Sequence, residues 1–361
     1  MRHLATIREI ASLRPIAGAD RIEVAQVDGW ECVVQKGEFH TGEHIVYIEV
    51  DSIVPERPEF EFLRDRKFRV RTIKLRGQVS QGLVLPLSIL PNGTPAILGA
   101  DVTDALGIKK YDPEAQQEAQ LLTKQPQKPQ SAIARFLMRF KWYRKLFMKP
   151  KRKGGFPDWI AKTDETRIQN LTTLFEMERN KGTKFSVTEK VDGQSATYYL
   201  RKVSKRKYEF GVCSRNIYLG TPDNSSYWTI AHQLHIEDVL KHLVGDYETI
   251  VLQGEICGNQ IQGNKYHISG YDLFAFNLIY PDHKCGTAEI KKLLEPYGIK
   301  TVPIVEEDKT LPETIAELVE YSKGKSVVRK EQKREGVVMR NVQSNISFKV
   351  INPDFLLAEK D

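Results

Sequence analysis

Residues 188–195, TEKVDGQS, decide how this chain is interpreted. Lys190 follows the strand-like run 185–189, FSVTE, and precedes Gly193, which permits a sharp turn. A lysine amine attacks phosphorus or carbonyl only when it is unprotonated, so a nucleophilic lysine needs burial or cationic neighbours that lower its pKa from about 10.4. Asp192 is expected on the same face as Lys190, where it can hold a divalent metal ion or its water. On its own, a KxDG tetrapeptide is more often a surface hairpin than a catalytic site.

Five more short stretches follow, each at or beside an expected strand. They are SRN at 214–216, QGEI at 253–256, LFAF at 273–276, REGVVM at 334–339 and SFKVIN at 347–352. In this order the set resembles the nucleotidyltransferase motifs of the covalent superfamily that comprises RNA ligases, DNA ligases and messenger RNA capping enzymes. The stretch 254–264, GEICGNQIQGN, resembles ATP-dependent RNA ligases that seal nicked duplexes. Each motif residue alone is more often structural than catalytic, but their joint order favours an adenylyltransferase.

The resemblance implies a nucleotide site with ATP as cosubstrate. Lys190 is then the adenylated nucleophile, and Phe276 stacks on the adenine, which needs only an aromatic face. Glu255 holds the ribose, and Glu189 helps to read the adenine amino group. Arg215 is expected near the ribose and the reacting RNA end.

The resemblance also implies a phosphate and metal site. Asp192 and Glu335 would orient a hydrated Mg²⁺ or Mn²⁺ through water, and Lys349 would neutralise the α-phosphate, because charge builds on phosphoryl oxygens during transfer. Two positions depart from the family pattern, which often has a lysine where Ser347 stands and an amide or Arg where Ser195 stands. Another cation is expected to share the leaving-group stabilisation, with two candidates: Lys265 and Arg340.

Residues 1–105 are expected to form a small all-β module. Strand-like runs at 22–27, 30–34 and 45–50 are separated by turn signals such as Asp28-Gly29. The module, with the sequence AGADRI at 17–22, resembles an OB fold and implies RNA binding. Because it also resembles tRNA-binding OB domains, a non-catalytic RNA-binding scaffold stays open as an alternative.

A basic strand is expected in this module from residue 67 to residue 72. Period-two alternation places Lys67, Arg69 and Arg71 on one face and the more apolar residues on the other. Lys74 and Arg76 extend this surface. It is either a solvated outer face or a groove that tracks a nucleic-acid backbone.

The chain is expected to be α+β, an OB-like barrel followed by a ligase-type domain of antiparallel sheets with flanking helices. The domains are residues 1–105, a linker at 106–155 and the adenylyltransferase domain at 156–361. The linker is rich in Gln, Lys and Pro, and Ser131 can begin a basic amphipathic helix that packs on the protein, contacts RNA or lies on a membrane. Helices are expected at 226–243, 288–294 and 312–323.

Composition bounds the partners. The chain of 361 residues carries a formal charge of +7, which favours an anionic partner, and its four cysteines form no CxxC pair. An intracellular, cytoplasmic setting fits, since no secretory signal or membrane-spanning run is visible, and no obligate protein partner is indicated. The expected partner is RNA, as a nicked duplex or hybrid.

The implied reaction has three steps. Lys190 attacks the ATP α-phosphate and expels pyrophosphate, AMP moves to an RNA 5′-phosphate, and an RNA 3′-hydroxyl displaces AMP. A capping guanylyltransferase or a DNA ligase remains a second alternative, although such enzymes usually carry another OB domain after the last motif and only twelve residues follow Lys349 here.

Overall fold

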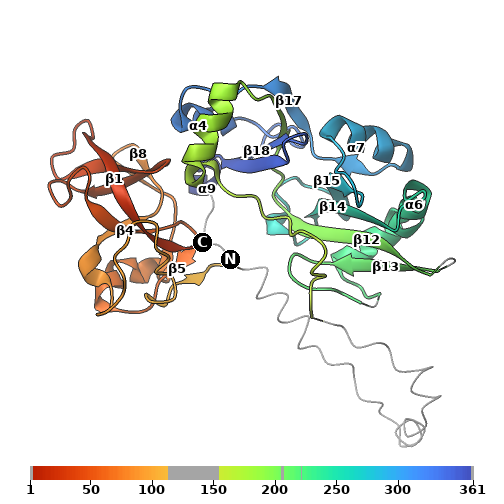
Figure 1. Cartoon of the computed structure of the whole chain (residues 1–361), viewed down its shortest axis with the longest axis horizontal. Coiled ribbons are helices and arrows are strands. Elements are labelled where there is room, and N and C mark those ends of the chain that lie inside the picture. Colours follow the sequence, from red (N-terminus) through yellow and green to blue (C-terminus); the bar gives the residue numbers. More distant parts are fainter. Residues whose placement is uncertain (1–2, 113–153, 205–206, 221, 359–361) are drawn as a thin grey trace, which may run out of the picture.

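The protein consists of an N-terminal β module and a larger part with two sheets, as the computed structural model in Figure 1 shows. The structure describes residues 3–112, 154–204, 207–220 and 222–358. The helix expected after Ser131 lies outside these residues. All four cysteines are buried and unpaired. None of the described helices is long and apolar enough to cross a membrane.

The N-terminal module is built on a five-stranded antiparallel sheet in the order β3-β2-β1-β4-β9. Two small sheets, β10-β5-β6 and β7-β8, complete it. The bounds are β1 (Ala5–Pro15), β2 (Ile22–Val27), β3 (Trp30–Gln35), β4 (His44–Ile48), β5 (Ser52–Ile53), β6 (Arg69–Val70), β7 (Ile73–Leu75), β8 (Gln78–Ser80), β9 (Leu83–Pro86) and β10 (Lys109–Lys110), with the 3₁₀ helices η1 (Pro58–Arg66) and η2 (Leu87–Ile89).

The long strand β1 curls this sheet. Its first half pairs with β4 and its second half with β2, and the register shifts between Ile10 and Ser12. Such an irregularity bends a strand and helps a sheet close on itself. Apolar side chains fill both sides of the bend, Ile7 and Phe60 in one cluster and Trp30 in the other. The result is a curled half-barrel.

The expected continuous strand at 67–72 is wrong. Helix η1 ends at Lys67, which has φ of 52°, and Phe68 has φ of 57°, so both residues are left-handed and only Arg69–Val70 forms a strand. The alternation of exposure is nevertheless present. Phe68 and Val70 are buried, Lys67 is exposed, and Arg69 and Arg71 are half-buried. The three cations therefore still point away from the apolar side chains.

The larger part contains two sheets. One is antiparallel in the order β17-β11-β18-β19, and the other has the order β13-β12-β14-β15-β16, in which only β15 and β16 are parallel. Their bounds are β11 (Phe185–Glu189), β12 (Gln194–Ser204), β13 (Lys207–Cys213), β14 (Thr249–Gly258), β15 (Tyr271–Ile279), β16 (Lys300–Thr301), β17 (Ile304–Lys309), β18 (Gly336–Asn341) and β19 (Ile346–Ile351).

Helices cover one face of each sheet. Ala196, Tyr198 and Leu200 of β12 pack in the core under α5, α6 and α7, while Phe175 of α4 and Leu318 of α8 pack on the smaller sheet. The helices are α4 (Thr172–Lys181), α5 (Ser226–Gln233), α6 (Ile236–Leu243), α7 (Thr287–Leu294), α8 (Ile315–Ser322) and α9 (Pro353–Ala358), with 3₁₀ helices η3 (Ile168–Asn170), η4 (Gln262–Asn264) and η5 (Glu295–Tyr297).

Two helix predictions need correction. The helix expected at 226–243 is broken into α5 and α6, because His235 adopts a left-handed φ of 48° between them. Pro312 does not begin α8. The N-terminal cap of α8 is Thr314, whose hydroxyl accepts a hydrogen bond from the Glu317 backbone N–H at 3.2 Å. The expected α+β class is confirmed.

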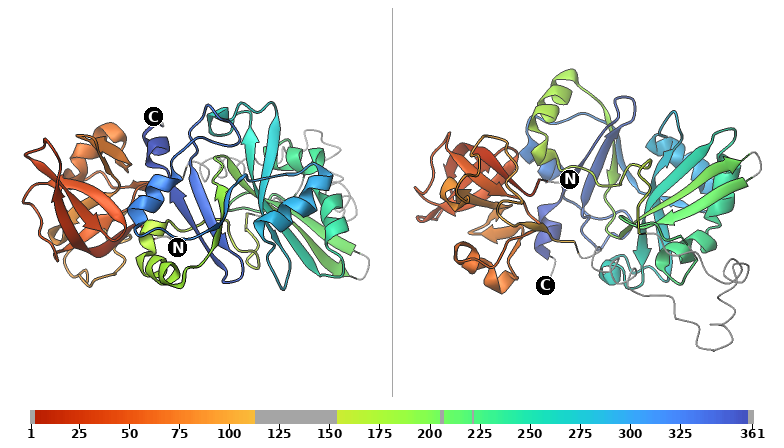
Figure 2. Two further views of the ribbon diagram at one scale, coloured as in Figure 1. Left: turned by 90° about the horizontal axis from the view of Figure 1, so that it is seen from above. Right: turned by 60° about the horizontal axis from the view of Figure 1, so that its bottom comes forward.

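The N-terminal module lies against the side of the smaller sheet, and the larger sheet lies beyond it, as both views in Figure 2 show. Asn170 of η3 joins the two parts. Its amide oxygen accepts a hydrogen bond from Trp30 Nε1 and its amide nitrogen donates to Glu49, each at 2.6 Å. The Arg167 guanidinium pairs with Asp51 at 3.1 Å. Polar contacts thus connect the module to the start of the second part.

Candidate active site

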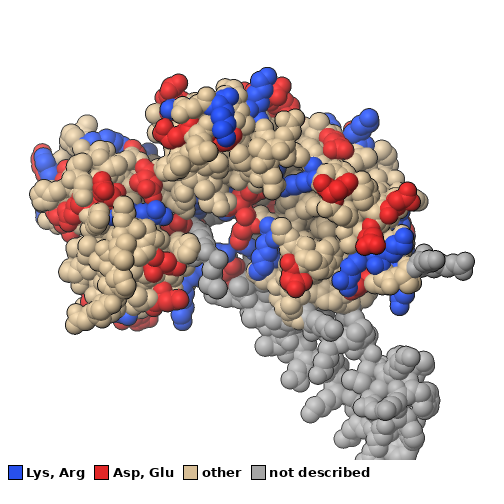
Figure 3. All heavy atoms as spheres, viewed as in Figure 1, with Lys and Arg blue, Asp and Glu red and all other residues tan. Residues whose placement is uncertain are grey.

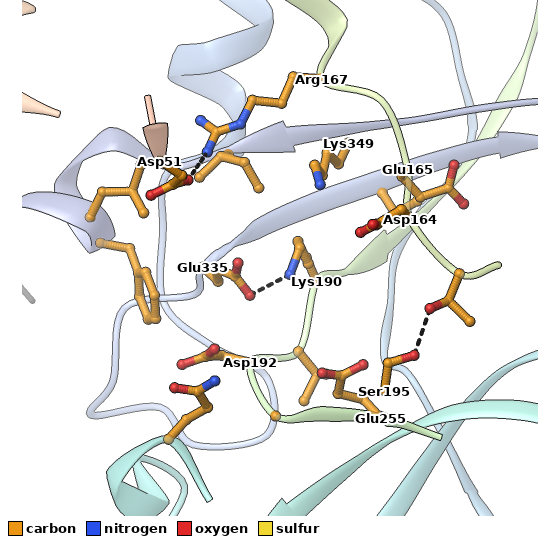
Figure 4. A pocket seen from close by; sticks show the side chains of 18 of the residues that line it. Asp51, Asp164, Glu165, Arg167, Lys190, Asp192, Ser195, Glu255, Glu335 and Lys349 are labelled. Atoms are coloured by element: carbon orange, nitrogen blue, oxygen red, sulfur yellow. Dashed lines mark hydrogen bonds and ion pairs between the residues drawn. The ribbon is translucent and has the colours of Figure 1, made fainter. Parts of the chain in front are cut away.

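A cavity of about 900 Å³ lies between the N-terminal module and the two sheets (Figure 4). Strand ends of both sheets open into it, and every motif singled out from the sequence contributes a lining residue. These are Glu189, Lys190, Asp192, Arg215, Glu255, Phe276, Glu335 and Lys349. Side chains that are far apart in the sequence, from Glu189 to Lys349, therefore meet in one cavity.

Strand pairing brings Lys190 and Glu335 together. Strands β11 and β18 are antiparallel neighbours with Glu189 opposite Val337, so the residue after β11 lies beside the residue before β18. Lys190 Nζ is 2.7 Å from Glu335 Oε2, and the two side chains are 26% and 14% exposed. The turn that follows needs Gly193, since a Cβ there would lie 2.4 Å from the Ile256 carbonyl oxygen. Any larger residue would displace this loop.

The charge state of Lys190 differs from the expectation. Burial disfavours its ammonium form, but the carboxylates of Glu335, Glu255 and Asp192 outweigh burial and raise the pKa of Lys190 above its ordinary value. The expected lowered pKa is thus wrong for the protein alone. Burial and the charge of Glu335 also raise the pKa of Asp192, although Lys265 pairs with it at 2.6 Å. Acidic groups dominate this wall.

Cations line the opposite wall, where Figure 4 shows Lys349 pointing toward Lys190 and Asp164. The Lys349 backbone N–H donates to the Thr166 carbonyl at 2.9 Å, which ties β19 to the segment that precedes η3. Arg215 pairs with Asp164. Burial opposes ionisation of Asp164, but Arg215, Lys349 and Lys110 outweigh it and lower the pKa of Asp164 to about 2.

Phe276, Arg340 and Glu189 line one part of this cavity together with the apolar side chains of Val302 and Val338. Phe276 of β15 is half-buried there, and the Arg340 guanidinium carbon lies 5.7 Å from its ring centre. Glu189 is 1% exposed. Its Oε2 accepts a hydrogen bond from the Val327 N–H at 2.7 Å, whereas its Oε1 has no partner among the described residues. Burial raises the pKa of this carboxyl group.

The two departures from the family pattern have identifiable neighbours. The Ser347 hydroxyl donates to Glu165 at 2.7 Å, and Arg340 is directly opposite Ser347 in the β18–β19 pair. Arg340 also lines the cavity, while Lys265 lies across it beside Asp192. Ser195 shares a hydrogen bond of 2.6 Å with Thr163.

The basic surface expected on the N-terminal module is divided in two. Lys67, Arg69 and Arg71 line the cavity. Lys74 and Arg76 are exposed on the hairpin formed by β7 and β8 and do not belong to that wall. The five cations therefore do not all line the cavity.

Several lining residues were missed by sequence reasoning. Asp51 pairs with Arg69 at 2.8 Å, and Tyr111 lies under the Arg69 guanidinium at 3.6 Å. Nothing in the spacing of these residues distinguishes them from surface positions. The segment that precedes η3 also contributes Thr163, Asp164, Glu165 and Arg167 to the lining.

Two family models and several solved structures match this chain. A family model of an OB-fold domain matches residues 4–87, and the RNA ligase family model matches residues 183–351. Among solved structures, Naegleria gruberi RNA ligase with PPi is 34% identical, covers 99% of this chain and 98% of its own, and has a TM-score of 0.79. A mutant of that ligase with ATP and Mn is 34% identical over 100% of both chains, with a TM-score of 0.80. The comparison with curated proteins gave no match.

These matches define an enzyme with an OB fold followed by a ligase domain. The chain belongs to the RNA ligase family, as its motifs implied.

Proposed function

We propose that this protein is an ATP-dependent RNA ligase that works through a lysyl-AMP intermediate on Lys190. AMP then passes to an RNA 5′-phosphate, forming AppRNA, and an RNA 3′-hydroxyl displaces the AMP. The observation that carries this proposal is the position of Lys190 Nζ, 2.7 Å from Glu335, in a cavity with acidic groups on one wall and cations on the other. The similar Naegleria gruberi ligase has been solved with ATP, with AMP and with PPi.

The part of the cavity lined by Phe276 and Glu189 fits an adenine. The partnerless Oε1 of Glu189 can accept a hydrogen bond from the adenine amino group, because a buried oxygen without a partner is costly. Phe276 offers a flat face for the ring. Glu255 and Arg215 line the same cavity nearer its mouth, where the ribose and the RNA end would lie.

The acidic wall fits a divalent cation, and the similar ligase was solved with Mn. Asp192, Glu335 and Glu255 lie around one lysine, and Asp192 has a raised pKa because it is buried beside Glu335. Carboxylate oxygens are the ligands that Mg²⁺ and Mn²⁺ prefer. Asp192 and Glu335 would hold this ion, directly or through water. When bound, it would supply positive charge at the reacting phosphate.

The residues of the chain would act on ATP by position and charge. Lys190 would attack the α-phosphate once it loses its proton, for which Glu335 Oε2 is the neighbouring acceptor. Lys349 would neutralise the phosphoryl oxygens from the opposite wall, and Arg340 would assist in place of the lysine that Ser347 replaces. A cavity that fixes both reactants replaces a bimolecular encounter by an oriented one, which supplies much of the rate.

RNA would bind across the mouth of the cavity. Lys67, Arg69 and Arg71 line it from the OB domain, and Lys74 and Arg76 add exposed cations further out. Contacts of this kind go to phosphates, so binding should have little sequence preference and should weaken as salt rises. An affinity for RNA that hardly changes between low and high salt would contradict this part.

The covalent step has a direct test. The protein is incubated with Mg²⁺ and α-labelled ATP or GTP, denatured, and checked for label on the chain. We expect ATP alone to label the wild type and Lys190→Ala to abolish the label. Labelling by ATP that survives Lys190→Ala would remove the nucleophile assignment, and labelling by GTP would favour a capping enzyme.

The substrate has a second test. Nicked duplexes are prepared with RNA or DNA in each strand and at each side of the break, and joining is measured on each. We expect the highest rate where RNA supplies both ends of the nick. Faster joining of single strands than of nicked duplexes would contradict the proposed nick sealing.

A further inference from the structure

The segment 156–163 covers the face of β12 that the helices leave open. Successive side chains of a strand point to opposite faces. The even positions of β12 lie under α5, α6 and α7, so the odd positions face this segment. Ser195 bonds to Thr163 at 2.6 Å, and the Tyr199 ring lies 5.2 Å from the Trp159 ring. We call residues 156–163 the covering segment.

The covering segment leads outward from the active-site cavity. Its inner end, Thr163, lines the cavity, and Gln253 of β14 fixes its middle by donating to the Ala161 carbonyl at 2.8 Å. Trp159 lies further along β12. Figure 1 shows this segment on the side of the larger sheet away from α6 and α7. At about 3.3 Å per residue, the 11 residues of β12 span roughly 35 Å, room for several nucleotides.

Trp159 is an exposed ring with a rigid support. It is 40% exposed and meets Tyr199 edge to face at an interplanar angle of 79°. The Tyr199 ring in turn lies across Gly211, where a Cβ would come within 2.1 Å of it. The Arg201 guanidinium carbon lies 5.8 Å from the Trp159 ring. A fixed, partly open indole beside a cation has the features on which nucleobases stack.

Cations flank this ring along the strand. Lys162 is exposed, donates to Asn216 at 3.2 Å and lies next to the cavity, while Arg201 and Lys207 are exposed toward the end of the β12–β13 hairpin. Figure 3 shows Lys and Arg gathered on this part of the larger sheet. The acidic residues close by include Asp158, Asp164, Glu209 and Glu248; Glu209 is paired with Arg201 at 2.6 Å and Asp164 with Arg215. The charge complements a phosphate backbone.

We propose that this surface, formed by Trp159, Lys162, Arg201 and Lys207, holds the RNA strand that leads into the active-site cavity. A base stacks on Trp159, and the flanking cations contact the phosphates on either side of it. The inference rests on the proposed ligase function and adds an RNA subsite on the catalytic domain to the one on the OB domain. Stacking tolerates any base, so the subsite has no sequence preference.

The test compares Trp159→Ala with Trp159→Phe in the full-length protein. Two quantities are measured for each: ATP labelling of the chain without RNA, and affinity for a nicked RNA duplex at one fixed salt concentration. We expect Trp159→Ala to weaken RNA binding about tenfold, equivalent to about 1.4 kcal/mol, with labelling unchanged. Trp159→Phe keeps an aromatic face and should stay within about threefold of the wild type.

A matched control is Tyr297→Ala. Tyr297 is also an exposed aromatic residue, 37% exposed, but it follows α7 on the helical side of the same sheet and stacks on His242. It should change neither quantity. Equal losses of labelling and RNA affinity in Trp159→Ala would show that Trp159 only supports the fold, and unchanged RNA affinity would also overturn the proposal.

The cations have a separate readout. The double variant Lys162→Glu and Lys207→Glu should reduce the slope of log affinity against log salt by about 1.4 to 1.8, because each phosphate contact contributes about 0.7 to 0.9. An unchanged slope would contradict the proposed path. If ATP labels no form of the protein, the wild type included, the proposed function fails, while RNA affinity still decides whether this surface binds RNA.

Discussion

Replacing Asn170 by alanine tests how the OB domain is held on the catalytic domain. The Asn170 side chain accepts a hydrogen bond from the buried Trp30 indole and donates one to Glu49, which is 5% exposed. A neutral hydrogen bond contributes about 1 kcal/mol and one to a charged acceptor about 2 kcal/mol. We therefore expect Asn170→Ala to weaken the docking of the two domains by about 3 kcal/mol, which is a factor of roughly 100 in the docking equilibrium.

Urea unfolding measures this loss, because docking energy stabilises whichever domain unfolds first. The first transition should move to lower urea, and ATP labelling should fall as well, since both domains line the cavity. Asn180→Ala is the matched control. Asn180 is exposed on α4 with a contact of 3.4 Å to Arg179, so its loss should cost less than about 0.5 kcal/mol. Equal shifts in the two variants would refute the reasoning.

Three further predictions concern the cavity. Gly193→Ala should reduce ATP labelling more than tenfold, because its Cβ would overlap the Ile256 carbonyl, whereas Gly286→Ala, with open space at its Cβ, should label normally. Glu189→Gln should lower ATP labelling about tenfold, since its amide oxygen must accept from Val327 and its NH₂ then faces the adenine amino group. Asp164→Asn should destabilise the protein near neutral pH. The lowered pKa of Asp164, about 2, means that this stabilisation is complete above about pH 4 and disappears as pH falls toward 2, so stability curves of the two proteins should converge there.

The order of the motifs predicted the site better than any single residue did. Motif residues end or precede strands, and antiparallel pairing brings such positions together, as it does for Lys190 and Glu335. Contacts between domains gave no comparable signal. Asp51 and Tyr111 reach the cavity only because the OB domain docks beside it, and docking depends on contacts such as Asn170 with Trp30 that have no sequence pattern.

Electrostatics was the least predictable property. Chemistry at Lys190 suggested a neutral amine, but the sign of a pKa shift depends on which charges lie near the amine after folding. Three carboxylates lie there, while Lys349 stands on the opposite wall. Local backbone breaks were equally hidden. Lys67 and His235 are left-handed and interrupt segments whose apolar spacing is regular. Neither residue is the glycine that usually marks such a position, so the sequence did not indicate the break.

Strand register bears on a question that composition left open, namely which cation could take the role of the lysine missing at Ser347. Directly opposite residues of an antiparallel pair share one face and have Cβ atoms about 5 Å apart. Arg340 is opposite Ser347, lines the cavity, and its guanidinium donates to Thr188 Oγ1 at 2.9 Å. A shift of one residue in the register would turn Arg340 to the other face of the sheet. Both candidates pair with a carboxylate, Lys265 with Asp192 at 2.6 Å and Arg340 with Glu165 at 3.6 Å. The register therefore favours Arg340, because the neighbouring strand carries the charge that β19 lacks at residue 347.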